Sequence, residues 1–250
     1  METFIKNLAK GAGVILRGGF GTKFKVSPKS VYGDVVTEYD IAAENFIIEK
    51  IKKRFPSHGI MAEESGHVKA HNFWVIDPLD ATHAFARGWD QFSVSIAFVS
   101  HNKIMHGAVY APMSDELFVA SRNKGSWYNG KRIYASSKPS LSLSNVSLTL
   151  AVWTPIKERR KILRFVADEK LWFGHMESVA LSEAYTACGR YDMLISSDCQ
   201  PWDYAAGAII MKEAGAKVTQ IDGKPYRWDS RSLLAANPVL HKQVLKAICK

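Results

Sequence analysis

Hydrophobic residues recur at intervals of three and four in two long stretches near the start of the chain. The first stretch, residues 1–20, predicts an amphipathic helix, and the second predicts a helix over residues 37–55 that Pro56 ends. Basic residues interrupt the first stretch, so it contains no continuous apolar segment. We therefore expect neither a signal peptide nor a membrane span there.

Shorter apolar runs with strand-like composition follow. Residues 72–76 form a run that ends abruptly at Asp77. Residues 92–99 and 104–111 flank a short polar segment, which predicts a hairpin. Further strands are predicted at residues 59–62, 117–120 and 126–134. This succession is typical of an antiparallel sheet.

The second half of the chain alternates between the two kinds of pattern. Helices are predicted over residues 155–167, 177–188, 203–214 and 238–248. Strands are predicted over residues 146–152, 191–196, 216–221 and 232–235. A polar segment at residues 136–139 indicates a boundary, so we expect an α+β half over 1–137 and an α/β half over 138–250.

Composition adds a preference for anionic partners. The chain has 250 residues and a net charge of +9, which favours phosphorylated metabolites, nucleic acid or membrane surfaces. Its densest basic run, residues 157–161, includes Glu158 and is better interpreted as a solvated helix face than as a nucleic-acid arm. Cys188, Cys199 and Cys249 match no disulfide or zinc pattern, which indicates a reducing cytosol.

Acidic residues stand at junctions between apolar elements and loops in four parts of the chain. Carboxylate oxygens are the ligands that Mg²⁺ prefers. Several of them from separate loops could form a two-metal site, which activates water and stabilises the leaving oxygen of a phosphoryl group. The residues are Asp40, Glu63, Glu64, Asp77, Asp80 and Asp203.

Residues 77–82 combine possible metal ligands with a possible phosphate site. Pro78 restricts the turn, and the Leu79 carbonyl could face a metal ion. We expect Asp80 to cap a short helix that follows it. The amides of Ala81 and Thr82 would then lie at the positive end of that helix, where phosphate binds well.

Each acidic feature alone also has a simpler interpretation. Asp80 and Asp203 could only cap helices, and Asp77 before proline is a common start of a turn. The Glu63–Glu64 pair could be a solvated loop, and Asp40 could be a charge in the first turn of a helix.

Four segments in order resemble the inositol monophosphatase family, the lithium-sensitive, magnesium-dependent sugar phosphatases. That superfamily also includes fructose-1,6-bisphosphatases and bisphosphate nucleotidases. The resemblance implies a layered α-β-α-β-α sandwich, usually assembled as a homodimer. The segments that carry it are residues 34–40, 62–65, 74–82 and 202–215.

The resemblance also implies ligands for Mg²⁺. Glu63, Asp77 and the Leu79 carbonyl would hold a first ion, and Asp77, Asp80 and Asp203 a second. Glu64 would contribute to a third, weaker site.

Catalytic and substrate roles follow from the same resemblance. Glu63 and Thr82 would orient the attacking water, with Asp40 supporting Thr82. Asp80 and the amides of Ala81 and Thr82 would bind the phosphate. Ser178, Val179 and Ser196 would lie at positions that contact the rest of the substrate.

Two departures from the family pattern concern the substrate side. The family usually has Gly where this chain has Ala81, and the added methyl crowds the phosphate unless the residue is helical. Inositol-specific members carry an acidic residue where this chain has Ser196. The hydrolytic residues are all present, whereas a preference for inositol phosphate is not supported.

The sequence therefore predicts a cytoplasmic, magnesium-dependent phosphatase acting on a phosphate monoester of a small polyol, sugar or nucleotide. Fructose-1,6-bisphosphate, a 3′-phosphoadenosine nucleotide and NADP are alternative substrates. A non-catalytic role associated with RNA or a polymerase is the alternative from another class, motivated by the net charge of +9.

Overall fold

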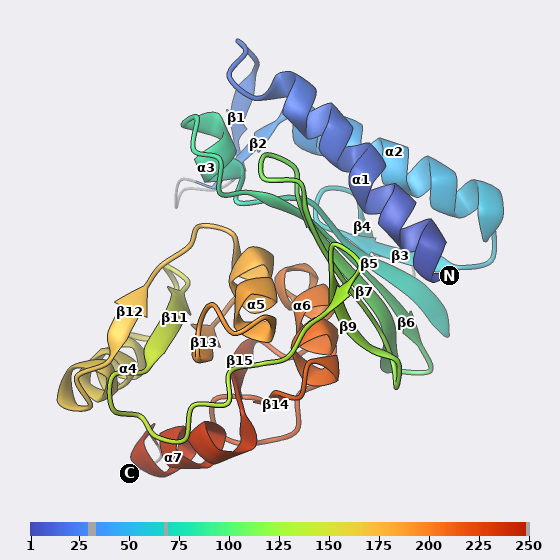
Figure 1. Cartoon of the computed structure of the whole chain (residues 1–250). Coiled ribbons are helices and arrows are strands. Elements are labelled where there is room, and N and C mark those ends of the chain that lie inside the picture. The colour runs from blue at the N-terminus through green and yellow to red at the C-terminus, as the bar shows by residue number, and fades with distance from the viewer. Residues whose placement is uncertain (30–33, 68–69, 249–250) are drawn as a thin grey trace.

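The chain folds into five layers, in the order helices, sheet, helices, sheet, helices (Figure 1). The structure is a computed structural model that describes residues 1–29, 34–67 and 70–248. This arrangement confirms the α-β-α-β-α sandwich that the resemblance implied. Cys188 and Cys199 are free thiols, and Cys249 lies outside the described residues.

The first layer consists of α1 (Glu2–Gly19) and α2 (Glu38–Arg54). Both expected helices are present, and α1 buries the apolar stripe that predicted it. Thr37 caps α2, because its hydroxyl accepts hydrogen bonds from the amides of Tyr39 and Asp40. No helix in the described ranges is both long and apolar enough to cross a membrane.

The larger sheet has the strand order β10-β9-β8-β7-β6-β5-β3-β4. The strands from β5 to β10 pair antiparallel, and β3 runs parallel to β5. The expected hairpin is formed by β6 and β7. The bounds are β3 (Gly59–Ala62), β4 (Gly66–His67), β5 (Asn72–Asp80), β6 (Ser93–Ser100), β7 (Lys103–Ala111), β8 (Glu116–Ser121), β9 (Gly125–Tyr128) and β10 (Lys131–Arg132).

The central layer consists of α5 (Val179–Ala187) and α6 (Pro201–Glu213), which lie between the two sheets in Figure 1. The approach of α6 to the larger sheet requires a residue without a side chain on β7. A Cβ atom at Gly107 would come within 2.6 Å of the Ala206 carbonyl oxygen. Small residues along α6 therefore place this helix, and Asp203 in its first turn, close against the sheet.

The second sheet has the order β12-β11-β13-β15-β14, and α4 and α7 form the last layer. It is mixed, because β11 runs parallel to both neighbours and β15 antiparallel to both of its own. The bounds are β11 (Asn145–Leu150), α4 (Ile156–Asp168), β12 (Trp172–Gly174), β13 (Met193–Ser197), β14 (Lys217–Thr219), β15 (Ser232–Ala236) and α7 (Pro238–Ile248).

Several boundaries differ from the sequence-based expectation. Strand β5 continues past Ile76 as far as Asp80. Helix α5 begins at Val179 rather than at residue 177, since Ser178 caps it, and α6 begins at Pro201. Four short elements were not expected: β1 (Val26–Pro28), β2 (Val35–Thr37), β4 and β12. The division into halves at residue 137 stays a prediction.

A buried charged network joins the larger sheet to the central layer. Glu116 on β8 accepts hydrogen bonds from Arg190 at 2.5 Å, Tyr185 at 2.6 Å and Tyr128 at 3.0 Å. Burial works against the charge of Glu116, but these donors outweigh it and lower its pKa to about 2. The carboxylate is thus charged and fully engaged at neutral pH.

We predict that Glu116→Gln lowers the free energy of unfolding by about 2 kcal/mol at neutral pH, because hydrogen bonds to a charged group are stronger than neutral ones. The folded-state pKa of about 2 lies below the ordinary 4.5. The stabilisation by the Glu116 carboxylate is therefore complete at a pH above its ordinary pKa of 4.5, and it is lost as the pH falls toward the folded-state pKa of about 2.

Urea unfolding at neutral and at strongly acidic pH measures this effect. The difference between Glu116→Gln and the unmodified chain should shrink in acid. Glu169→Gln, at an exposed position after α4, is the matched control and should change stability by less than about 0.5 kcal/mol. A Glu116→Gln variant as stable as the unmodified chain at neutral pH contradicts the assignment.

Candidate metal centre and active site

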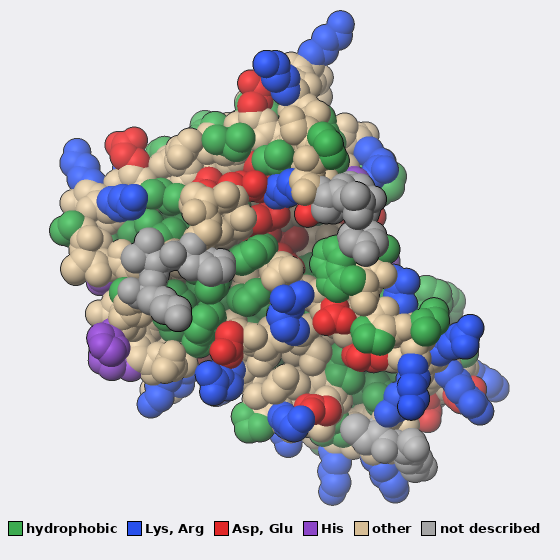
Figure 2. All heavy atoms as spheres, turned by 180° about the vertical axis from the view of Figure 1, so that it is seen from behind, with side chains coloured by type: hydrophobic (Ala, Val, Ile, Leu, Met, Phe, Trp, Pro, Cys, Tyr) green, Lys and Arg blue, Asp and Glu red, His purple; other side chains and the backbone are tan. Residues whose placement is uncertain are grey.

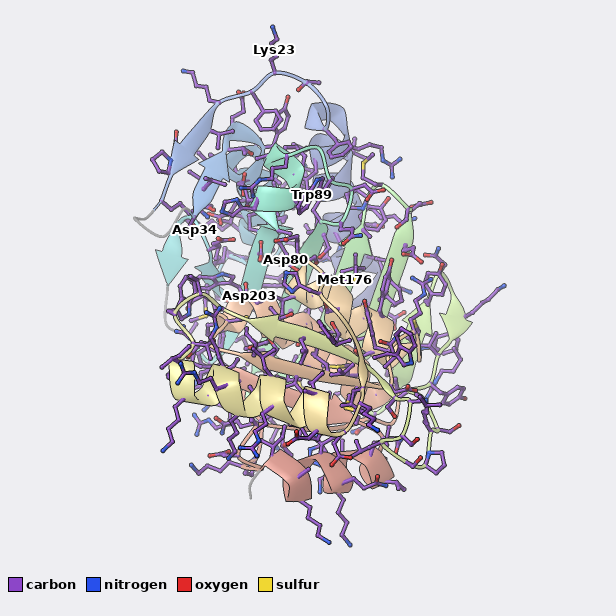
Figure 3. The ribbon with its side chains drawn as sticks, turned by 90° about the vertical axis from the view of Figure 1, so that its left-hand side faces the viewer. Lys23, Asp34, Asp80, Trp89, Met176 and Asp203 are labelled. Carbon is purple, nitrogen blue, oxygen red and sulfur yellow. The ribbon has the colours of Figure 1, made fainter. Side chains whose placement is uncertain are left out.

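Three carboxylates from two elements meet at one point between the layers. Oxygen atoms of Asp77, Asp80 and Asp203 all lie within 4.8 Å of one another. Asp77 and Asp80 end β5, and Asp203 lies in the first turn of α6. Figure 3 shows Asp80 and Asp203 close together near the middle of the molecule. The structure thus brings together residues that are more than a hundred positions apart in the sequence.

A β-bulge at the end of β5 explains how Asp77 and Asp80 reach the same side. Residues three apart on a regular strand point to opposite faces. Here the pairing with β6 shifts between Asp77, opposite Ser95, and Asp80, opposite Ser93, which places one extra residue in β5. Pro78 fits the bulge because it has no N–H to donate, and the Leu79 amide donates to Asp77 Oδ1 at 3.0 Å.

Asp80 does not cap the helix that follows it, so that expectation was wrong. Its carboxylate turns to the start of α5, where it accepts hydrogen bonds from Ser178 Oγ at 2.6 Å and the Ala180 amide at 2.8 Å. The Val179 amide lies 3.3 Å from its other oxygen. Burial raises the pKa of Asp80 to about 6, although these hydrogen bonds oppose the rise. A contact between distant segments has replaced the local cap.

Ala81 instead stands at the N-terminus of the short helix α3 (Thr82–Ala86). Its backbone is left-handed, with φ 77° and ψ 51°, so the helical conformation considered for it was wrong. This conformation costs an L-residue about 1 kcal/mol, and glycine adopts it freely. The glycine usual in the family therefore matches the backbone here, and Ala81 adopts the same turn at a cost.

Asp203 is the third residue of α6 and forms a capping box with Gln200. Its Oδ2 accepts the Gln200 amide at 2.6 Å, and the Gln200 side chain accepts from the backbone in return. The alternative in which Asp203 is itself the cap is therefore wrong. Burial first, and then the charges of Asp80 and Glu63, raise the pKa of Asp203 well above its ordinary value.

Asp77 lies at the centre of this repulsion. It is buried, and the charges of Glu63, Asp80 and Asp203 add to the effect of burial and raise its pKa well above the ordinary range. Carboxylates packed this closely favour a cation between them. Their oxygens and number fit Mg²⁺, which takes carboxylate, carbonyl and water ligands.

Thr82 and Asp40 form the expected contact beside the carboxylates. The Thr82 hydroxyl donates to Asp40 Oδ1 at 2.7 Å and lies 3.1 Å from the Leu79 carbonyl oxygen. The amide of Thr37 donates to the other oxygen of Asp40 at 2.8 Å. Asp40 therefore does more than place a charge in the first turn of α2: it fixes the direction of the Thr82 hydroxyl.

Lys29 completes the site, and the sequence analysis did not identify it. Its Nζ lies 2.7 Å from Glu63 Oε1 and also contacts Glu64 Oε1. Burial opposes its charge, but the two glutamates raise its pKa overall. Burial also raises the pKa of Glu64, to about 7. The solvated-loop interpretation of these glutamates was wrong, since their side chains are only 17% and 16% exposed.

Glu183 is a further acidic group behind the cluster. It is fully buried in α5, and neither of its oxygens has a hydrogen-bond partner among the described residues. Burial and the charges of Asp80 and Asp203 raise its pKa well above the ordinary value, which favours the neutral acid. Gly207 accommodates it, because a Cβ there would lie 1.7 Å from Glu183 Oε2. As the one charged residue of α5, Glu183 could have been singled out from the sequence.

The residues expected on the substrate side have other contacts. Ser178 is fully buried and donates to Asp80, and the Val179 amide lies against the same carboxylate. Ser196 is also fully buried, with its Oγ 2.9 Å from Tyr204 Oη. Both hydroxyls are thus engaged within the protein, and the substrate roles expected for Ser178, Val179 and Ser196 stay predictions.

The surface around the cluster is hollowed. Figure 2 shows acidic side chains gathered in a depression near the middle of the molecule, with basic side chains over other parts of the surface. Trp89 lies above the carboxylates in Figure 3, and its side chain is 52% exposed.

Comparison with known proteins agrees with this geometry. The whole chain, residues 1–250, matches the family model described as the inositol monophosphatase family. It is 34% identical over 251 residues to the Thermotoga maritima protein named fructose-1,6-bisphosphatase/inositol-1-monophosphatase. That alignment covers 98% of this chain and 94% of the relative. It is 36% identical over 251 residues to the Pasteurella multocida protein named Nus factor SuhB. That alignment covers 96% of this chain and 92% of the relative.

A solved structure shares the complete fold. The extragenic suppressor protein suhB from Bartonella henselae aligns with a TM-score of 0.93 at 30% identity, covering 99% of this chain and 98% of that one. Sequence and fold therefore agree over the full length, and the chain belongs to the inositol monophosphatase family.

Proposed function

We propose that this protein is a magnesium-dependent phosphatase that hydrolyses a phosphate monoester of a small polyol, sugar or nucleotide. The observation that carries the proposal is the convergence of Asp77, Asp80 and Asp203, with oxygens within 4.8 Å of one another. Family membership supports a phosphatase, and the acidic cluster supports a divalent cation.

The metal ligands are proposed residue by residue. Glu63, Asp77 and the Leu79 carbonyl would hold one Mg²⁺, and Asp77, Asp80 and Asp203 a second. Glu64 would contribute to a third, weaker site. Bound Mg²⁺ supplies a Lewis acid, which makes water a better nucleophile and offsets the charge of the phosphate.

The protein's own groups would orient the reactants. The Thr82 hydroxyl donates to Asp40 at 2.7 Å, so its oxygen is free to accept a hydrogen bond from the attacking water. Glu63 would receive the proton of that water. The first amides of α3, including that of Thr82, have no partner within the helix and would donate to the phosphate together with the Ala81 amide.

Fructose-1,6-bisphosphate, a 3′-phosphoadenosine nucleotide and NADP are the alternatives to an inositol phosphate. Ser196 stands where inositol-specific members carry an acid, and it is buried in this structure. Phosphate release measured over these four substrates ranks them. The homodimer and the cytoplasmic location stay predictions.

We predict that Asp203→Asn lowers magnesium-dependent phosphate release by at least about 100-fold, since even the outer partners of metal ligands contribute 10–100-fold. The same change should leave the metal-free fold as stable or more stable, because it removes one charge from a repelling cluster. Phosphate release and thermal unfolding without metal measure the two effects.

Asp168→Asn, at an exposed position on α4, is the matched control and should leave both unchanged. The site assignment is wrong if Asp203→Asn turns over at close to the full rate.

A second candidate function is an RNA-associated role. Several relatives are named Nus factor SuhB, among them the Pasteurella multocida protein at 36% identity. The net charge of +9 favours an anionic partner. Helix α4 contributes the exposed side chains of Lys157, Arg160, Lys161 and Arg164 to one region of the surface.

We predict for this role that the chain binds RNA with an affinity that falls steeply with salt and that Asp77→Asn leaves unchanged. Filter binding over a range of salt concentrations measures it. Lys161→Met together with Arg164→Met should weaken binding and reduce the salt dependence. RNA binding that is absent at low salt rejects this candidate and leaves the phosphatase proposal intact.

A further inference from the structure

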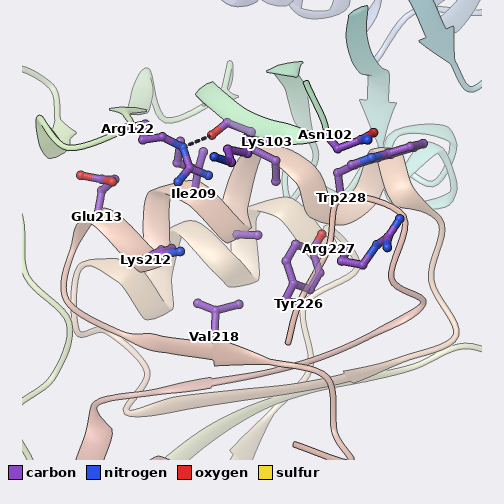
Figure 4. A pocket seen from close by; sticks show the side chains of 12 residues that line it. Asn102, Lys103, Arg122, Ile209, Lys212, Glu213, Val218, Tyr226, Arg227 and Trp228 are labelled. Atoms are coloured by element: carbon purple, nitrogen blue, oxygen red, sulfur yellow. Dashed lines mark hydrogen bonds between the residues drawn. The ribbon is translucent and has the colours of Figure 1, made fainter. Parts of the chain in front are cut away.

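A cavity lies beside the C-terminal half of α6, whereas Asp203 lies in the first turn at the other end of that helix. It has a volume of about 180 Å³ and is enclosed by the β6–β7 hairpin, α6 and the segment after β14 (Figure 4). That volume is below the size of typical drug-sized pockets, which begin at about 300 Å³. A ligand of this cavity must therefore be compact.

Positive charge dominates the walls of the cavity. Lys103, Arg122, Lys212 and Arg227 line it, against Glu213 as the acidic residue. The carboxylate of Glu213 is already engaged, because it accepts the amides of Asn123 and Gly125 at 2.9 Å each. The cavity is therefore lined by four basic side chains against one carboxylate, and that carboxylate is held by backbone amides rather than by the basic groups.

The basic groups are only partly satisfied within the protein. Among the residues that the structure describes, neither Lys103 nor Lys212 has an ion-pair partner, and Arg227 has only an exposed pair with Asp229. Arg122 donates through Nε to the Ile104 carbonyl at 3.0 Å, which fixes its guanidinium beside the cavity. Figure 4 shows Lys103, Arg122 and Lys212 on one side and Arg227 on the other.

Two buried donors at the same cavity also lack an acceptor. Within the described ranges, Trp228 Nε1 and Tyr226 Oη are buried atoms without a hydrogen-bond partner. An indole N–H can only donate, and a buried donor left unpaired costs about 1–3 kcal/mol. The Trp228 ring packs edge-on against Phe73 at 4.9 Å, so its position is fixed. Both donors line the cavity and have no acceptor among the described residues.

We propose that this cavity is a second anion site, separate from the carboxylate cluster, which binds a compact organic phosphate without metal. A phosphate dianion supplies several acceptor oxygens for the lysines, the arginines and the two buried donors. Ile104, Ile209 and Val218 provide an apolar wall for the organic part. The carboxylate cluster repels an anion in the absence of cations, whereas this cavity attracts one.

Titration of the metal-free protein with phenyl phosphate in EDTA tests the site. Calorimetry should show saturable binding, and Lys212→Met or Arg227→Met should each weaken it about tenfold. Both side chains are exposed, so neither change should disturb folding. Trp228→Phe keeps an aromatic side chain but removes the N–H together with the five-membered ring, and it should weaken binding several-fold. Lys242→Met, exposed on α7, is the matched control and should leave the affinity unchanged.

The outcomes separate this site from the proposed active site. Binding that Asp203→Asn leaves unchanged supports the second site, because no metal and no turnover are involved. The proposal is overturned if binding does not saturate, or if Lys212→Met and Arg227→Met bind as tightly as the unmodified chain. It is equally overturned if Lys242→Met weakens binding as much as they do, since the attraction is then only the net charge.

Discussion

The mutual repulsion of Asp77, Asp80 and Asp203 is the constraint on which the rest of the site depends. Their oxygens lie within 4.8 Å of one another in a largely buried position, so burial and charge both disfavour ionisation. A fold tolerates such an arrangement only when other groups hold each carboxylate in place. A cation bound between them would convert the repulsion into attraction, which is why the geometry indicates a metal centre.

A different feature of the backbone positions each carboxylate. The bulge in β5 and the Leu79 amide position Asp77. The amides at the start of α5 position Asp80, and the capping box of α6 positions Asp203. Both helix starts also bring the positive ends of helix dipoles toward the acids. The central helix layer is therefore part of the site, and the close packing of α6 on the sheet through Gly107 serves it.

Local motifs in the sequence predicted much of the site. Residues 74–82 and 202–215 placed the acids at the ends of elements, and the long helices and the hairpin followed from hydrophobic periodicity. The features that the sequence did not predict depend on contacts between segments far apart in the chain. The local sequence predicts that Asp80 caps a helix, but its carboxylate instead accepts hydrogen bonds from Ser178 and Ala180 at the start of α5. Lys29 carries no local signal, since only the folded chain brings it to Glu63 and Glu64.

If Asp77, Asp80 and Asp203 form a metal centre, their raised pKa values mean that they take up protons without metal and release them when Mg²⁺ binds. Calorimetric titration of the metal-free protein with Mg²⁺ near the pKa of Asp80, about 6, in buffers of different ionisation enthalpy counts those protons. We predict that Mg²⁺ binding releases protons and that Asp77→Asn releases fewer of them. Binding heats that are identical in all buffers, or no Mg²⁺ binding, would contradict it.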